Sequence, residues 1–134
     1  MKVGYKVWLD NDGKAFGDGP YELLRRVEKM MSLHRAANQM GMSYSKAWRL
    51  IRTLEERLGF PLLERKVGGQ SGGGSLVTSQ ARNLMNHYEG FRRDIDTSLK
   101  KIYRKHFHAP FISPNPPPTA GKRSRRRAAR TKGK

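Results

Sequence analysis

The fold of this chain is decided by residues 36–51, which read AANQMGMSYSKAWRLI. Ala37 and Gly41 stand four residues apart. Two helices that cross steeply need a small residue where their backbones approach and a glycine where the chain reverses. Ser43 is a good N-cap for the helix that follows, and Gly59 with Pro61 ends it near residue 58. The segment predicts two helices joined by a sharp turn.

The second of these helices, residues 43–58, has two different faces. At 100° per residue, one sector is apolar and must face the core, namely Ala47, Leu50, Ile51, Leu54 and Leu58. The opposite face is polar and basic, as in a recognition helix that reads bases in the major groove. Its candidate DNA contacts are Ser43, Ser45, Lys46, Arg49 and Arg52. An ordinary solvent-exposed face remains the alternative for any one of them.

Two aromatic residues lie at the edge of the apolar sector. We expect Trp48 to pack against a neighbouring element, which is the more common role of an aromatic at such a position. Tyr44 could pack in the same way or donate a hydrogen bond to a phosphate, and we include it among the candidate DNA contacts.

Downstream of the helix pair, residues 62–67 and 75–77 read as two short strands around a glycine-rich loop. This hairpin would be the wing of a winged helix. Arg65 and Lys66 would then approach the phosphate backbone or the minor groove. A nucleotide-binding loop fails as an alternative, because no lysine follows Gly74.

The segment before the helix pair predicts a hairpin and a first helix. Residues 2–10 alternate like a strand, Asn11-Asp12-Gly13 is a turn signal, and residues 14–16 can return as a second strand. A helix opens at Asp18, and its apolar stripe would consist of Tyr21, Leu24, Val27 and Met31.

A long last helix is predicted from residue 78 to about residue 105. Apolar residues recur along it at spacings of three and four, a pattern typical of a seam for another helix. We assign this seam to a two-fold dimer and name its residues Leu84, Tyr88, Phe91, Ile95, Leu99 and Ile102. A helix folded back on its own domain is the alternative.

The formal net charge of +17 indicates a polyanionic partner, nucleic acid first and an acidic membrane surface second. Eight basic residues lie after His106, where no acidic residue occurs. Residues 107–134 are therefore expected to be a proline-rich spacer and a disordered basic tail, either an arm that contacts phosphates or a solvated tail without a specific role. No apolar run approaches 18 residues and no signal peptide is evident, so we expect a cytoplasmic protein.

Chemistry of other kinds has little support. The chain has no cysteine, which excludes a disulfide framework and thiolate chemistry. His106 and His108 lack a further ligand, and no acidic pair or nucleophile–base pair stands out. We therefore expect no enzyme, no metal and no cofactor.

Several motifs together resemble a known family. Residues 42–48 (MSYSKAW), 58–65 (LGFPLLER) and 68–78, with its paired glycines, are similar to the N-terminal domain of ModE-type molybdate-responsive regulators, a winged helix-turn-helix related to the LysR type. The resemblance covers about residues 1–105. It implies a bacterial or archaeal DNA-binding regulator that dimerises through its terminal helix. It places Ser43, Tyr44, Ser45, Lys46 and Arg49 on the recognition helix, and Lys66 with Gln70 in the wing.

Members of that family carry C-terminal molybdate-binding domains, whereas here a proline spacer and a basic tail follow the last helix. We therefore expect a stand-alone DNA-binding domain, for which molybdate binding is doubtful.

The sequence thus predicts a mainly α protein with a small amount of β structure. Residues 1–77 would form the winged helix-turn-helix, 78–106 the dimerisation helix and 107–134 the spacer and tail. The expected function is a homodimeric, sequence-specific transcription regulator that binds double-stranded DNA at the nucleoid of a prokaryote. An architectural DNA-coating protein is the first alternative, an RNA-binding protein the second, and a direct small-molecule oxyanion sensor the third.

Overall fold

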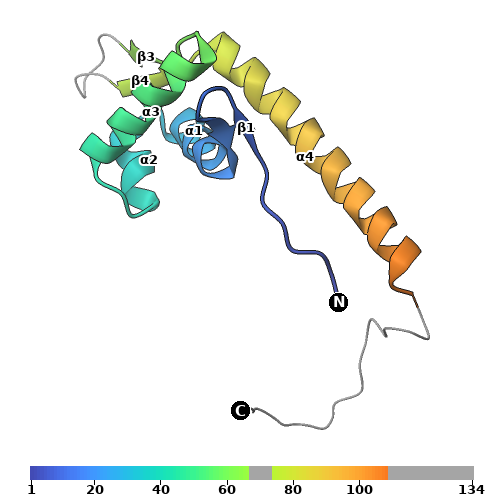
Figure 1. Ribbon diagram of the computed structural model, residues 1–134. Helices are drawn as coiled ribbons and strands as arrows, with labels where there is room; N and C mark the ends of the chain where they lie inside the picture. Colours follow the sequence, from blue (N-terminus) through green and yellow to red (C-terminus); the bar gives the residue numbers. More distant parts are fainter. Residues whose placement is uncertain (67–73, 109–134) are drawn as a thin grey trace, which may run out of the picture. The chain divides into compact units, whose positions relative to one another are not determined.

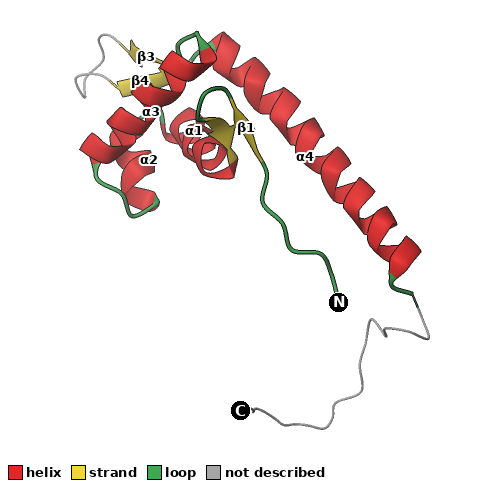
Figure 2. Ribbon diagram, in the orientation of Figure 1, coloured by secondary structure: helices red, strands yellow, loops and turns green. Residues whose placement is uncertain are grey.

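The computed structural model describes residues 1–66 and 74–108. Within these residues the elements are β1 (Trp8–Asp10), β2 (Lys14–Gly17), α1 (Asp18–Met30), α2 (Leu33–Gln39), α3 (Tyr44–Leu58), β3 (Leu63–Lys66), β4 (Gly74–Val77) and α4 (Ser79–His106). Helices dominate, and the strands form only two hairpins, so the expected mainly α winged helix-turn-helix is confirmed (Figure 2). Gln70 and the predicted spacer and tail from residue 109 onward lie outside the described residues.

The chain divides into two compact units. One consists of Tyr5–Arg92 and contains both hairpins, α1, α2, α3 and the first half of α4. The other combines Met1–Gly4 with the chain from Arg93 onward. The larger unit, Tyr5–Arg92, positions the candidate site, and Figure 1 shows the β3–β4 hairpin beside α3.

Capping residues that can be recognised in the sequence set the helix boundaries. The Oγ of Ser32 accepts a hydrogen bond from the Arg35 amide at 3.1 Å, and that of Ser43 does the same for Lys46 at 3.1 Å. Gly41 has a φ of +71° and Gly59 of +87°, a left-handed conformation that glycine adopts at little cost. The predicted turn between the two helices is therefore present.

The core of the larger unit lies where α1, α2, α3 and the start of α4 meet. Ala37 from α2 is fully buried, as are Ala47 and Ile51 from α3. Leu54 is also buried, while Leu50 and Leu58 are partly buried against the same cluster. These residues form the apolar sector that the periodicity of α3 predicts.

Two expectations for the N-terminal segment were wrong. The apolar stripe of α1 does not include Met31, which is 41% exposed. The helix ends at Met30, and Met31 is its C-cap with a φ of +56°. Leu23 is buried in the stripe in its place. The first strand covers only Trp8–Asp10. Trp8 pairs with Gly17, which is the last residue of β2. The residues before Trp8 therefore have no partner strand, although apolar and polar residues alternate among them.

The wing is held at both of its roots. The Glu55 carboxylate on α3 accepts hydrogen bonds from the amides of Leu62 and Leu63, at 2.7 and 3.3 Å. On the other strand, the Ser75 amide donates to the carbonyl of Met31 at 3.1 Å. Gly74 lies so close that a Cβ atom there would stand 2.4 Å from the same carbonyl oxygen. The hairpin is thereby fixed against the ends of α1 and α3.

The first half of α4 completes the core. Ala81, Met85 and Tyr88 are buried, and the Tyr88 ring meets Phe16 edge-on at a centroid distance of 5.2 Å. The Tyr88 hydroxyl donates to Asp18 at 2.5 Å. Burial and this hydrogen bond both raise the pKa of Tyr88. The sequence assigned Tyr88 to the dimer seam; it instead packs inside its own domain.

Replacing Gly74 by alanine should destabilise the fold. The new methyl group would collide with the Met31 carbonyl, a backbone atom that cannot turn aside, so the free energy of unfolding should fall by about 1–3 kcal/mol. Urea denaturation followed by circular dichroism measures this. Gly19→Ala is the matched control, because a Cβ at Gly19 meets no atom within 4 Å. Equal stability of the two variants would contradict the close approach at Gly74.

Candidate nucleic-acid interface

The outward face of α3 carries the residues predicted to contact DNA. Ser43, Tyr44, Ser45, Lys46, Arg49 and Arg52 are all exposed. They lie at the N-terminal end and along the side opposite the buried Ala47, Ile51 and Leu54. All six residues are therefore accessible, the basic ones on the outward face and Tyr44 at the edge of the apolar sector.

The cations on this face are available to an external anion. Within the described residues, neither Lys46 nor Arg49 forms an ion pair. Arg52 reaches Glu55 only at 3.9 Å, and its side chain is 65% exposed. Its guanidinium also lies over the Trp48 ring, 5.4 Å from the centroid. An exposed contact at that distance contributes little stability, so Arg52 remains free to bind phosphate.

Arg65 and Lys66 stand exposed at the end of β3, where the wing begins. They pair in register with Ser75 and Gly74 of β4. Successive side chains of a strand point to opposite faces, so Arg65 and Lys66 lie on opposite faces of the hairpin. Arg65 lines the space between the wing and α3, whereas Gln70 belongs to residues outside the description.

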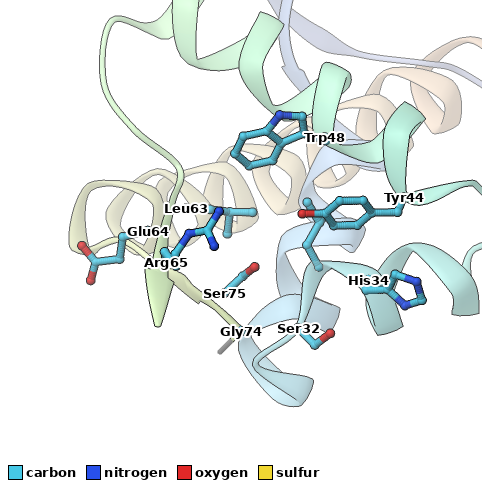
Figure 3. A pocket seen from close by; sticks show the side chains of 10 residues that line it. Ser32, His34, Tyr44, Trp48, Leu63, Glu64, Arg65, Gly74 and Ser75 are labelled. Carbon is cyan, nitrogen blue, oxygen red and sulfur yellow. The ribbon is translucent and has the colours of Figure 1, made fainter. Parts of the chain in front are cut away.

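A groove of about 270 Å³ lies between α3, the start of α2 and the wing. Its lining includes Ser32, His34, Tyr44, Trp48, Arg65 and Ser75 (Figure 3). We call it the aromatic groove. The His34 and Tyr44 rings lie 5.6 Å apart across the α2–α3 turn, and both residues line the groove.

Trp48 is the residue of this surface that the sequence did not place there. The sequence predicts a packed ring, but Trp48 is 41% exposed on the wall of the aromatic groove, and Tyr44 is 46% exposed beside it. The sequence did contain a signal. Tyr44 and Trp48 are four residues apart, so they share one edge of the helix next to the basic face.

Other kinds of site find no support in the described parts of the chain. In residues 1–66 and 74–108, no three histidine, aspartate or glutamate side chains gather where they could hold a metal ion. Among the same residues, no helix is sufficiently long and apolar to cross a membrane.

Comparison with known proteins identifies a family with similar sequence. Residues 21–81, from α1 through the wing to the start of α4, match the family described as bacterial regulatory helix-turn-helix protein, lysR family. This is a family of regulators and not a class of enzymes.

Individual relatives point the same way. The chain is 33% identical over 98 residues to the molybdenum transport protein ModE of Azotobacter vinelandii, covering 72% of this chain and 36% of that protein. It is 34% identical over 71 residues to the transcriptional regulator ModE of Haemophilus influenzae, covering 53% and 28%. It is 31% identical over 90 residues to the DNA-binding transcriptional dual regulator ModE of Escherichia coli, covering 66% and 34%. The chain thus spans about a third of the length of these relatives.

Ser43 caps α3, and a single substitution tests how much that cap stabilises the fold. Because its Oγ caps α3, Ser43→Ala should lower the free energy of unfolding by about 1 kcal/mol even without DNA. Ser45→Ala is the matched control, since Ser45 is exposed within the helix and should change stability by less than about 0.5 kcal/mol. Thermal or urea unfolding measures both. A Ser43→Ala protein as stable as the parent would show that the cap contributes nothing.

Proposed function

On the premise that this chain carries a ModE-like winged helix-turn-helix domain of the lysR family, we propose that it is a sequence-specific transcription regulator acting on duplex DNA. In this proposal α3 enters the major groove and reads base edges, while the wing contacts the backbone or the minor groove. A regulator of this type would act on the chromosome in the cytoplasm of a bacterium or archaeon.

The observation that carries the proposal is the exposed basic face of α3. Arg49 can make a bidentate contact with guanine, and Lys46 can reach a base or a phosphate as a point charge. Ser43, Tyr44 and Ser45 add short hydrogen-bonding groups at the end of the helix that enters the groove. The opposite side of α3 is buried, so this face is the one that α3 offers to a partner.

A two-fold dimer through α4 is the second part of the proposal. Phe91 is 40% exposed and Ile102 54%, and Ile95 and Leu99 stand between them in the sequence at spacings of three and four. Leu84, nearer the core, is half-buried and can contribute only its outer edge. A second copy would cover this seam and present two recognition helices to one face of DNA.

The proposal stops short of an effector. Several relatives have names that refer to molybdenum, but the matched parts cover about a third of their lengths. We therefore propose no molybdate-binding role for these residues.

An architectural protein that coats DNA is the alternative that one observation favours. The net charge is +17, and eight of the basic residues stand after His106. Charge of this kind binds phosphates of any sequence and weakens steeply with salt.

Selection of bound sites from random duplex DNA separates these functions. The regulator should yield a two-fold symmetric consensus, whereas a coating protein should yield none. Arg49→Ala should then lower affinity for the selected site by about 1–3 kcal/mol and relax the consensus at one position in each half-site. Arg25→Ala on α1 is the matched control, because it removes an exposed arginine from another helix. If Arg49→Ala lowered the affinity for every DNA sequence equally, Arg49 would not read a base.

Ile102→Glu should weaken the dimer, because it places a charge at an exposed position of the apolar seam. Sedimentation equilibrium should give a mass near twice 15.3 kDa for the parent and a mass shifted toward 15.3 kDa for the variant. Thr97→Glu introduces the same charge on the opposite side of α4 and should leave the mass unchanged. A parent that sediments as a monomer, or two variants with the same mass, would contradict dimerisation through this seam.

A further inference from the structure

We propose that the aromatic groove holds the sugar–phosphate backbone of one DNA strand, with the Tyr44 and Trp48 rings against deoxyribose and the Arg65 guanidinium on a phosphate. The inference rests on the proposed function. It assigns to Trp48 a binding role that neither base reading by Arg49 nor dimerisation by α4 requires.

Tyr44 and Trp48 are two large aromatic residues that remain exposed on α3. The inner side of α3 consists of Ala47, Ile51 and Leu54, which are buried in the core. Tyr44 and Trp48 nevertheless leave 46% and 41% of their surfaces open to solvent, side by side on one helix edge. Neighbouring exposed aromatics with one wet and one apolar side are typical of a contact surface.

The charges around the rings select the partner. Arg52 lies over the Trp48 ring on the side of the basic face, and Arg65 stands on the wing side of the groove. Glu64 also borders the groove, but Figure 3 shows its carboxylate directed away from the two rings. A surface with apolar ring faces between two cations suits a chain that alternates sugars and phosphates.

The walls of the groove are held in place before any ligand arrives. On one side, Glu55 on α3 binds the amides of Leu62 and Leu63, just before Arg65. On the other, Ser75 is bonded to the Met31 carbonyl. Rigid walls lose little conformational freedom on binding, which favours affinity.

The groove, of about 270 Å³, is lined by the exposed side chains of His34, Tyr44, Trp48 and Arg65. An open groove beside the recognition face fits a contact along an extended strand. Contacts to phosphate and sugar position a protein on DNA and carry no sequence information.

The contact therefore has a distinctive energetic signature. Trp48→Ala should weaken binding to the selected site and to unrelated duplexes by a similar factor, about three- to tenfold, without changing the salt dependence. Arg65→Ala should also weaken both, but it should reduce the slope of log affinity against log salt by about 1. Loss of discrimination at a single base pair in Trp48→Ala would overturn the backbone assignment.

Fluorescence can test the contact without removing the ring. The chain has two tryptophans, so Trp8→Phe leaves Trp48 as the sole emitter, and Trp48→Phe leaves Trp8, which is 50% exposed on β1. Anisotropy of labelled duplex DNA reports binding by each protein. Acrylamide quenching with and without unlabelled duplex reports whether the remaining tryptophan becomes covered; acrylamide is neutral, so the charge of DNA does not repel it.

We expect DNA to bind to both proteins, to reduce the quenching constant of Trp48 severalfold, and to leave that of Trp8 unchanged. If DNA binds while Trp48 stays equally accessible, the groove assignment is wrong and the proposed function stands. Equal protection of both tryptophans would also overturn the assignment, because it indicates general coating. If anisotropy detects no binding by either protein or by the parent, the proposed function fails together with the inference.

Discussion

Burial of Ala47, Ile51 and Leu54 sets the rotation of α3, and the arrangement of the interface depends on that rotation. Once this face is turned inward, each residue of the helix has a defined direction at 100° intervals. Arg49 must point outward, and Trp48 must lie at the edge beside the wing. Glu55 must face the wing strand whose amides it binds. A different rotation would separate the basic face, the aromatic groove and the wing from one another.

The local parts of this arrangement could be predicted from the sequence. Ser32 and Ser43 cap helices and Gly41 and Gly59 end them, because these effects depend on neighbours within four residues. The apolar sector of α3 follows from periodicity alone. The fold class therefore needed little information from distant parts of the chain.

The errors have a common cause in contacts between distant residues. Alternation in residues 2–7 predicts a strand, but β2 is too short to pair with it. Tyr88 fits the periodicity of an intermolecular seam. It is buried in the core instead, because its ring packs against Phe16 and its hydroxyl donates to Asp18, some 70 residues earlier. Trp48 stays 41% exposed, although its place at the edge of the apolar sector predicted packing. The outward residues of the candidate site could be named from the pattern, but the groove that joins them to the wing could not.

The base of the wing is anchored at two points, one on each strand of its hairpin. The peptide groups before Arg65 are bound to Glu55, and those at Ser75 are bound to Met31, so the register of the hairpin is set below the segment between Lys66 and Gly74. Loss of either anchor would free one strand of the hairpin from the helix that holds it. The position of Arg65 beside α3 therefore depends on residues that need not touch DNA themselves.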